Sequence, residues 1–316
     1  MKTPNNSIPA FPQPVMNRRS ALRLFGLGAA GLAATPLLAG CTGTTSGSPG
    51  DAGTTFGSNM SDGSSKEAMA QVLADFEKQE SATITVNTVS HSDFQSNINN
   101  YLQGNPDSVF TWFSGLRMRV FAENGLAVPV DDVWSSLGSH YSDSVREACT
   151  ADDGSAYLVP WNTYPWGVFY RKSVFADNGF SIPATWDSFV ALCTDIQGTG
   201  MAPIAFGDKE LWPALGTFDQ INLRLNGYDF HMALMAHEES WDQPRVREVF
   251  DYWNQILPFH QENGLGRTWQ EASAALADGT AAMQVIGLGQ IGGQITGAEA
   301  EDLDFFPFPE INPEHG

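Results

Sequence analysis

Large aromatic side chains in this chain fall in loops near predicted strand ends, beside acids, amides and guanidinium groups. In a parallel α/β sheet, ligands bind at the loops beyond the carboxyl ends of the strands. Aromatic rings in such loops could cover the apolar C–H face of a sugar, while the polar groups bond its hydroxyl edge. The candidate ligand-binding residues are Asp62, His91, Trp112, Arg117, Tyr164, Trp166, Asp208, Trp212, Asp219, Asn222, Trp269 and Glu271.

Individually, these residues also have a simpler explanation. Tryptophan is highly buried on average, so any one of the four indoles could pack in a core or between two lobes. Glu271 follows Thr268 at the spacing of a helix-capping box, and it could serve the helix rather than a ligand. The concentration of the whole set in loops favours a cleft for a polar ligand, with the indoles stacking and the polar groups bonding hydroxyls.

The other motifs do not support catalysis or metal binding. The run Gly287-x-Gly289-x-x-Gly292 matches a dinucleotide fingerprint, but only 24 residues follow it, too few for the rest of such a domain. His237-Glu238 lacks the second histidine of a zinc-protease helix. Nothing selects the pair of opposed carboxylates that a glycoside hydrolase needs. We therefore predict no catalytic residue, no metal and no cofactor.

Strand-like and helix-like segments alternate from residue 54 onward, which predicts an α/β fold with a parallel-rich sheet. A capping box at Ser64-x-x-Glu67 predicts the start of a helix, and Met69, Val72 and Phe76 then form one apolar stripe along it. The predicted strands are 54–58, 83–89, 108–113, 167–171, 202–206, 281–286 and 303–308.

The charge and cysteine content exclude several classes of partner. The chain has 36 acidic and 16 basic residues, a surface that repels nucleic acid and anionic lipid headgroups. Its 42% hydrophobic content is enough for one large domain or two lobes. Cys149 and Cys193 either form a disulfide or remain as two buried thiols, and both alternatives stay open.

The N-terminus resembles an export signal. Paired arginines at 18–19 precede an uncharged span at 24–39 that ends in Leu-Ala-Gly-Cys, with Cys41 as its last residue. The arginines resemble a twin-arginine signal and the tetrapeptide resembles a bacterial lipobox. The alternative is a transmembrane anchor, but a span of about 16 residues with an internal proline is short for one.

From this resemblance we expect residues 1–40 to be removed and Cys41 to carry lipid. Residues 41–53, rich in Gly, Ser and Thr, would form a flexible tether to the folded part. The mature protein would then lie outside the cytoplasmic membrane, either anchored to its outer face or periplasmic.

A series of longer motifs is similar to those of extracellular solute-binding protein family 1, the sugar-binding lipoproteins of ABC importers. This family includes the maltose-binding protein, and the nearest resemblance is to a subgroup that binds glucose, galactose or related sugars. The resemblance covers about residues 54–316. The segments that carry it are 101–119, 123–126, 164–173, 183–187, 217–228, 266–272 and 282–283.

The resemblance implies a two-lobed periplasmic-binding-protein-like fold of type II, without enzymatic activity. Its cleft would close on a mono- or oligosaccharide and present it to a membrane permease, and the protein would act as a monomer. Residues 54–161 would form the first lobe, 162–283 the second, and 284–316 would return to the first.

Two features depart from the family pattern. Relatives carry an aromatic residue where this chain has Gly289, so one stacking wall is expected to come from elsewhere. Family members also usually continue well beyond Pro309, so the C-terminal part is expected to be truncated at Gly316 and the hinge to be incomplete. An exported carbohydrate-active hydrolase and a truncated relative that binds nothing remain as alternatives.

Overall fold

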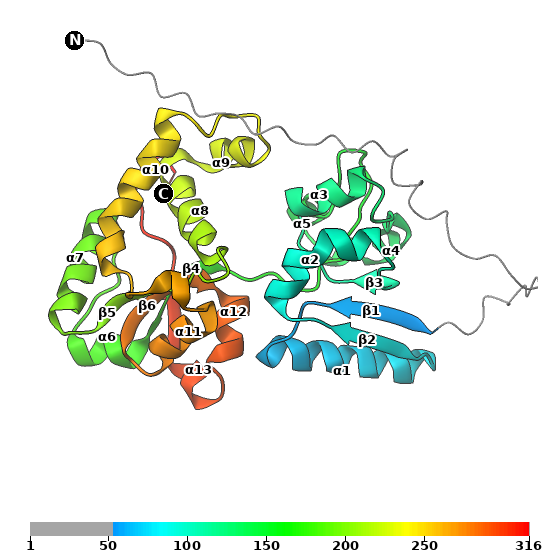
Figure 1. Ribbon diagram of the computed structural model, residues 1–316, viewed down its shortest axis with the longest axis horizontal. Helices are drawn as coiled ribbons and strands as arrows, with labels where there is room; N and C mark the ends of the chain where they lie inside the picture. Colours follow the sequence, from blue (N-terminus) through cyan, green and yellow to red (C-terminus); the bar gives the residue numbers. More distant parts are fainter. Residues whose placement is uncertain (1–52, 316) are drawn as a thin grey trace, which may run out of the picture. The chain divides into compact units, whose positions relative to one another are not determined.

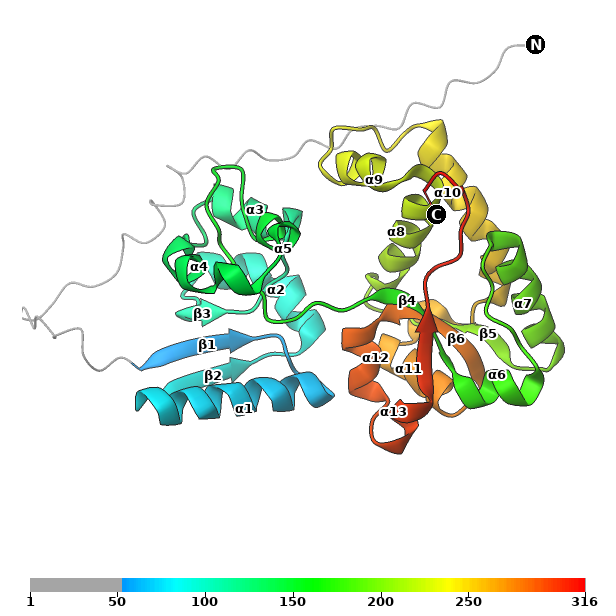
Figure 2. The ribbon, with the colours of Figure 1, turned by 180° about the vertical axis from the view of Figure 1, so that it is seen from behind.

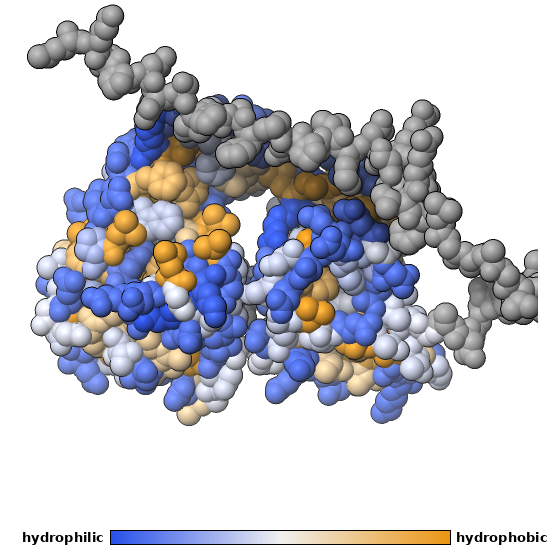
Figure 3. Space-filling model, in the orientation of Figure 1, coloured by the Kyte–Doolittle hydropathy of each residue, from blue (hydrophilic) through white to orange (hydrophobic). Residues whose placement is uncertain are grey.

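The computed structural model describes residues 53–315. The predicted signal at 1–40, the lipidation of Cys41 and the tether up to residue 52 lie outside the described residues. Within 53–315, no helix combines the length and apolar character needed to cross a membrane. Figure 3 shows a largely hydrophilic face interrupted by apolar patches, as expected for a strongly acidic chain.

The first lobe is built on a parallel sheet of three strands. β1 (Thr54–Ser58) pairs on one side with β2 (Ile84–Thr88) and on the other with β3 (Val109–Phe110). Helices α1 (Gly63–Glu80) and α2 (His91–Gln103) lie on opposite sides of these strands (Figures 1 and 2). The remaining helices of this lobe are α3 (Leu116–Glu123), α4 (Asp131–Leu137) and α5 (Asp143–Ala148).

The core of the first lobe lies on the α2 side of the sheet. Phe94, Ile98 and Leu102 follow at helical spacing along α2 and pack against Phe121 of α3. The apolar stripe of α1 is less well covered, because Val72 is 47% and Phe76 49% exposed. The predicted capping box at Ser64 is wrong: the helix begins at Gly63 with Asp62 as its N-cap residue, so Ser64 already lies inside the first turn.

The second lobe contains a mixed sheet, in the order β5–β6–β4–β7. Only β5 and β6 pair in parallel, whereas β4 is antiparallel to both β6 and β7. The prediction of a parallel-rich sheet therefore holds for the first lobe and is wrong for the second. The strands are β4 (Trp166–Arg171), β5 (Ala202–Ala205), β6 (Ala281–Gly287) and β7 (Leu303–Phe306).

Within the described residues, eight α-helices complete the second lobe. They are α6 (Lys172–Asn178), α7 (Trp186–Gly198), α8 (Pro213–Asn226), α9 (Tyr228–Met235), α10 (Pro244–Ile256), α11 (Trp269–Ala277), α12 (Leu288–Gln294) and α13 (Ala298–Asp302). Thr185 is a residue type that the sequence favours as a helix cap just before the apolar run that starts at Trp186, and it accepts a hydrogen bond from the backbone N–H of Ser188. The predicted capping box of Thr268 and Glu271 is also present. Both caps are therefore confirmed.

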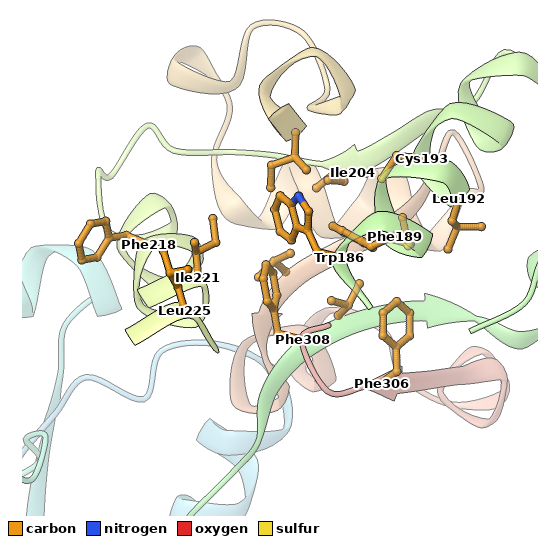
Figure 4. Packing of buried hydrophobic residues seen from close by; sticks show 14 of the residues in the cluster. Trp186, Phe189, Leu192, Cys193, Ile204, Phe218, Ile221, Leu225, Phe306 and Phe308 are labelled. Atoms are coloured by element: carbon orange, nitrogen blue, oxygen red, sulfur yellow. The ribbon is translucent and has the colours of Figure 1, made fainter. Parts of the chain in front are cut away.

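The largest buried cluster joins the sheet to α6–α10, and a smaller one contains residues of α11 and α12. Figure 4 shows Trp186 and Phe189 of α7 beside Phe308, and the Phe308 ring centroid lies 6.1 Å from Trp186 and 6.0 Å from Phe189. The segment 284–316 was expected to return to the first lobe. Its strands instead belong to the second-lobe sheet, whereas its helix α12 packs against α1 of the first lobe. β7 pairs with β4, and Phe306 and Phe308 are buried in the second-lobe core.

Both internal cysteines are free and buried. Cys149 belongs to a small cluster around Trp134 in the first lobe, and Cys193 lies on the buried face of α7 in the second. Burial raises the pKa of each thiol, and that of Cys193 to about 12. These two cysteines are therefore unbonded, unreactive apolar groups, which resolves the alternative left open by the sequence.

Candidate ligand-binding site

Aromatic rings from both lobes meet around Trp212. Its ring centroid lies 6.0 Å from that of His91 at the start of α2, 6.2 Å from Trp166 at the start of β4, and 6.1 Å from Trp269 at the start of α11. His91 belongs to the first lobe and the three indoles to the second. Four of the sequence-predicted residues are therefore neighbours in space, although 178 positions separate the first from the last in the chain.

The aromatic cluster continues into the first lobe through the loop after β3. The Phe113 ring lies 6.0 Å from His91 and 5.3 Å from Trp112. The guanidinium of Arg117 covers both rings, 4.1 Å from the centroid of Phe113 and 4.7 Å from that of Trp112. Phe113 was missed by the sequence reasoning, although its place next to Trp112 in the same loop was a usable signal.

A polar cavity of about 330 Å³ lies beside this cluster. Both lobes contribute to its walls, and the lining groups are hydroxyls, carboxylates, one imidazole and one amide. The lining residues are Ser61, Asp62, Ser90, His91 and Ser92 from the first lobe and Glu210, Thr268 and Gln270 from the second. Sequence reasoning found Asp62 and His91. Glu210 was missed, although it lies two residues before Trp212 in the loop that follows β5.

Several buried polar atoms near Trp212 have no hydrogen-bond partner among the described residues. They include the indole Nε1 atoms of Trp166, Trp212 and Trp269, the Oε2 atom of Glu210 and the Oε1 atom of Gln290. Outside this region, only Trp253 and Gln261 have such an atom in the described part of the chain. Native structures leave few buried polar atoms unpaired, so this concentration indicates groups whose partners come from a ligand or from water.

Hydroxyl groups would satisfy these atoms in pairs. An indole N–H only donates, and the oxygens of a carboxylate or amide only accept. A hydroxyl can accept from the first kind of group and donate to the second at the same time. A ligand rich in hydroxyls therefore matches the mixture of unpaired donors and acceptors around Trp212.

Four predicted residues instead have structural roles. Trp269 is 2% exposed and lies beneath Trp212 in a small core cluster. Asn222 has no exposed surface, and its amide lies 3.1 Å from His231 Nδ1 and accepts from Asn226 Nδ2 at 2.9 Å. The roles of these side chains are support for Trp212 and attachment of α8 to α9. Trp269 lies at the start of its helix, whereas Asn222, expected beside a loop, lies inside α8. The local pattern could not show which way either side chain points.

The other two of these four are helix caps. The Asp208 carboxylate is buried and accepts from the backbone N–H of Ala214 at 2.9 Å, in the first turn of α8. The Glu271 carboxylate accepts from the backbone N–H of Thr268 at 2.8 Å and completes the capping box of α11. Glu271 was recognised as a possible cap from its spacing, whereas the capping role of Asp208 was not predicted.

Burial shifts the pKa values of two titratable groups near the site, His91 and Asp219. Burial lowers the pKa of His91 although the neighbouring carboxylate of Asp62 opposes the shift, so the imidazole is neutral at pH 7. Burial raises the pKa of Asp219 to about 6, and no hydrogen bond to this carboxylate is formed within the described residues. Asp219 lies on α8 one turn after Gly216, which packs against the Trp166 ring, so the carboxylate is on the same face of the helix as that ring.

Trp112 and Tyr164 occupy the edges of the cluster. The Trp112 indole donates to the backbone oxygen of Arg117 at 3.2 Å and packs partly into the first-lobe core. The Tyr164 hydroxyl accepts from Gln290 Nε2 at 3.4 Å and is close enough to Arg117 to interact with its charge. Both residues therefore border the cluster, Trp112 on the first lobe and Tyr164 beside α12 of the second.

A larger hollow of about 410 Å³ lies within the first lobe alone. It is lined by Arg119, Asp143, Arg146, Glu147, Thr150, Ala151 and Gly154. None of these residues was predicted to bind a ligand, and none of them is aromatic. The unpaired donors and acceptors described above are in the second lobe around Trp212, so the smaller cavity is the better candidate.

The lobes approach closely at two glycines. A side chain on Gly63, at the start of α1, would overlap the backbone oxygen of Gly293 in α12. We predict that Gly63→Ala lowers the free energy of unfolding by more than Gly125→Ala does, by about 1 kcal/mol or more, because both variants strain a positive φ but only the first clashes. Urea titration of both variants measures the difference, and equal losses would show that this contact does not form in solution.

Comparison with known proteins places the chain in a family. An uncharacterized ABC transporter extracellular-binding protein of Pyrococcus horikoshii is 27% identical over 234 residues, which are 71% of this chain and 53% of that protein. A probable sugar-binding periplasmic protein of Brucella melitensis is 26% identical over 178 residues, 55% of this chain and 42% of that protein. The chain thus spans about half the length of the curated relatives it matches.

The structure shows the same relationship. It is similar to that of the bacterial solute receptor AcbH, with a TM-score of 0.81, 47% sequence identity and coverage of 83% of this chain and 67% of that one. AcbH is described as having an exclusive substrate preference for β-D-galactopyranose. The model of the bacterial extracellular solute-binding protein family matches residues 58–316. The chain belongs to this family of bacterial extracellular solute-binding proteins.

Proposed function

We propose that the chain is the sugar-binding component of an ABC importer and holds a neutral sugar beside Trp212. The observation that carries this proposal is the group of buried, unpaired indole N–H donors and carboxylate and amide acceptors around that residue. Sugar hydroxyls supply both kinds of partner, and the exposed part of the Trp212 ring offers an apolar plane for the sugar ring.

The cavity favours a small and uncharged sugar. A volume of about 330 Å³ is at the lower end of small-molecule sites, which suits a mono- or disaccharide better than a long oligosaccharide. Its walls carry the carboxylates of Asp62 and Glu210 and contain no lysine or arginine. An acidic sugar would therefore meet like charges, whereas a neutral sugar can donate hydrogen bonds to both carboxylates.

The similarity to AcbH supports β-D-galactopyranose as the first sugar to test. The name of the Brucella protein, a probable sugar-binding periplasmic protein, supports the same ligand class. The specific sugar remains part of the proposal, because the cavity is defined by groups that any neutral hexopyranose could satisfy.

The division of the site between two lobes supports capture by lobe closure. Asp62 and His91 come from the first lobe and Glu210 and Trp212 from the second, so a sugar can touch all four only when the lobes are together. Binding would stabilise the closed arrangement through these additional contacts. We assign no catalytic step, and the proposed role ends with delivery of intact sugar to the membrane permease.

The proposed mature protein is a monomer attached through lipid on Cys41 to the outer face of the membrane. Lobe 1 comprises 54–161 and lobe 2 begins at 162, and the strand pairing supports adding 284–308 to lobe 2. The permease would be its macromolecular partner, and nucleic acid would not be one because the strongly acidic chain repels it.

A ligand screen tests the function. We expect D-galactose or a related neutral hexose to raise the melting temperature of the purified chain, and D-galacturonic acid to have little effect. Isothermal titration with the best sugar should give one site per chain, and chromatography should recover that sugar intact. Release of a cleaved product would support the exported hydrolase, and no shift with any neutral mono- or disaccharide would support a relative that does not bind sugar.

A further inference from the structure

Three glycines leave the space that is occupied by the two aromatic rings of the segment Tyr164-Pro165-Trp166. A Cβ atom on Gly216 of α8 would overlap the Trp166 indole. A Cβ atom on Gly287, the last residue of β6, would lie 2.7 Å from Tyr164 Cε2, and one on Gly289 would lie 2.9 Å from Tyr164 Cε1. Real Cβ atoms do not approach other atoms this closely, so these rings occupy space that any other residue would fill.

Backbone conformation does not explain these glycines. Gly216 and Gly289 lie within helices, and neither has the positive φ that favours glycine. Gly287 has φ −83° and ψ 144°, an extended conformation open to any residue. Alanine would be the better helix former at 216 and 289, so what glycine provides at these positions is room for the rings.

The backbone of the aromatic segment is held against the same glycines. Trp166 is paired with Gly287 in the β4–β6 ladder, and the backbone N–H of Leu288 donates to the Pro165 oxygen at 3.0 Å. The segment therefore cannot move away as a whole. A side chain added at 289 would displace the Tyr164 ring. Within the described residues, the hydrogen bond of this side chain is a long one, from Gln290 Nε2 at 3.4 Å, and it offers little resistance to that displacement.

The two rings form an aromatic wall next to the cluster around Trp212, beside the residues that line the cavity. Trp166 is an edge-on neighbour of Trp212 at 79° between the ring planes, and the Tyr164 hydroxyl accepts a hydrogen bond from Gln290 Nε2 at 3.4 Å. Family relatives were expected to carry an aromatic side chain at the position of Gly289. Here the Tyr164 ring lies over that glycine and supplies an aromatic surface from a different segment.

We propose that Gly289 and Gly216 are positioning residues that set the depth of the Tyr164–Trp166 wall and thereby the size of sugar that fits. This proposal rests on the proposed function, because it assigns the wall to the sugar site. Gly289 is the more direct test, since the ring that it seats is near the protein surface and can shift without disturbing the core.

The experiment compares Gly289→Ala with Gly292→Ala in the same helix. A Cβ atom on Gly292 would meet only Leu288 Cδ1 at 3.8 Å, an ordinary contact. We expect Gly289→Ala to weaken binding of the sugar selected by the screen about tenfold and Gly292→Ala to change it less than about twofold. Gly292→Ala should not melt below the wild type, because alanine favours the helix. In Gly289→Ala the same gain is offset by the lost packing of the displaced ring, so its binding is measured at a temperature where the variant is fully folded. Wild-type affinity in Gly289→Ala would overturn the proposal.

A double-mutant cycle tests whether Gly289 affects sugar affinity through the Tyr164 ring or independently of it. If Gly289 acts through Tyr164, adding Gly289→Ala to Tyr164→Ala should cause no further loss of affinity. An equal loss in both backgrounds would show that Gly289 acts independently of the ring and would overturn the proposal.

A second readout does not need a sugar. Displacement of Tyr164 should change the near-ultraviolet circular dichroism of Gly289→Ala and not that of Gly292→Ala. Identical spectra for the wild type and both variants would contradict the claim that a side chain at position 289 displaces the Tyr164 ring. If the wild type binds no sugar while Gly289→Ala alone has an altered spectrum, the proposed function fails and the seating of the ring still stands.

Discussion

Trp212→Ala should weaken binding of the best neutral sugar about a hundredfold, or about 2.7 kcal/mol, which is the range of a binding hot spot. Trp212 contacts an aromatic ring of the first lobe and two of the second, and its own indole N–H has no partner within the described structure. Its removal takes away the proposed stacking plane and one donor together. Isothermal titration calorimetry measures the change.

The matched control for this prediction is Trp241→Ala. Trp241 is also a partly exposed indole, 44% exposed, but it stacks on Phe218 and is absent from the cluster around Trp212. We expect this variant to bind sugar as the wild type does. Equal affinities for Trp212→Ala and the wild type would remove Trp212 from the site, and a similar loss in both variants would point to a general effect on folding.

Asp219→Asn should have opposite effects on stability and binding. Burial raises the pKa of the Asp219 carboxyl to about 6, so the folded state holds its proton more tightly than the unfolded state. Stability is then lost as pH rises from about 4 to 6, and the ionised carboxylate destabilises the fold at pH 7. Each pKa unit corresponds to about 1.4 kcal/mol, and partial exposure of the side chain reduces the effect. We therefore expect the free energy of unfolding of the variant to exceed that of the wild type by about 1–2 kcal/mol at pH 7.

The difference in unfolding free energy between Asp219→Asn and the wild type should disappear near pH 3.5, where the wild-type carboxyl is protonated and therefore neutral, like the amide. Chemical denaturation at several pH values measures it, and Asp251→Asn, an exposed position in α10, should show no comparable gain at pH 7. We expect sugar binding by Asp219→Asn to fall about tenfold, since a charge-assisted hydrogen bond to a hydroxyl is lost. A variant less stable than the wild type at pH 7 would show that the carboxylate has a stabilising partner.

Much of the local structure followed from short patterns. Phe94, Ile98 and Leu102 have the spacing of one helix face and are the buried residues of α2. Thr185 and Thr268 are residue types that favour helix caps, and they precede α7 and α11. These signals are readable because helix periodicity and caps depend on residues within a few positions of each other. At Ser64 the capping-box pattern predicted the wrong start, because the helix begins one residue before it, at Gly63.

Strand direction in the second lobe was beyond the reach of such patterns. A strand that enters the sheet from the other lobe has the same alternation of side chains whether its neighbours run with it or against it. The pairing of β4 with β6 and β7 is decided by contacts between segments more than a hundred residues apart. The same contacts place Phe306 and Phe308 in the second-lobe core, where the family resemblance had assigned them to the first.

For the site, residue types and loop positions identified the aromatic groups that meet around Trp212, because strand ends are where an α/β fold exposes ligand-binding loops. Only the directions of the side chains show that Trp212 is partly exposed whereas Trp269 is buried. They also show that the carboxylates of Asp208 and Glu271 bond to backbone N–H groups at helix starts. The space that Tyr164 occupies over Gly289 likewise depends on packing between distant segments. Composition and periodicity act along the chain, whereas the direction of a side chain and the room around it are set only when separate segments pack together.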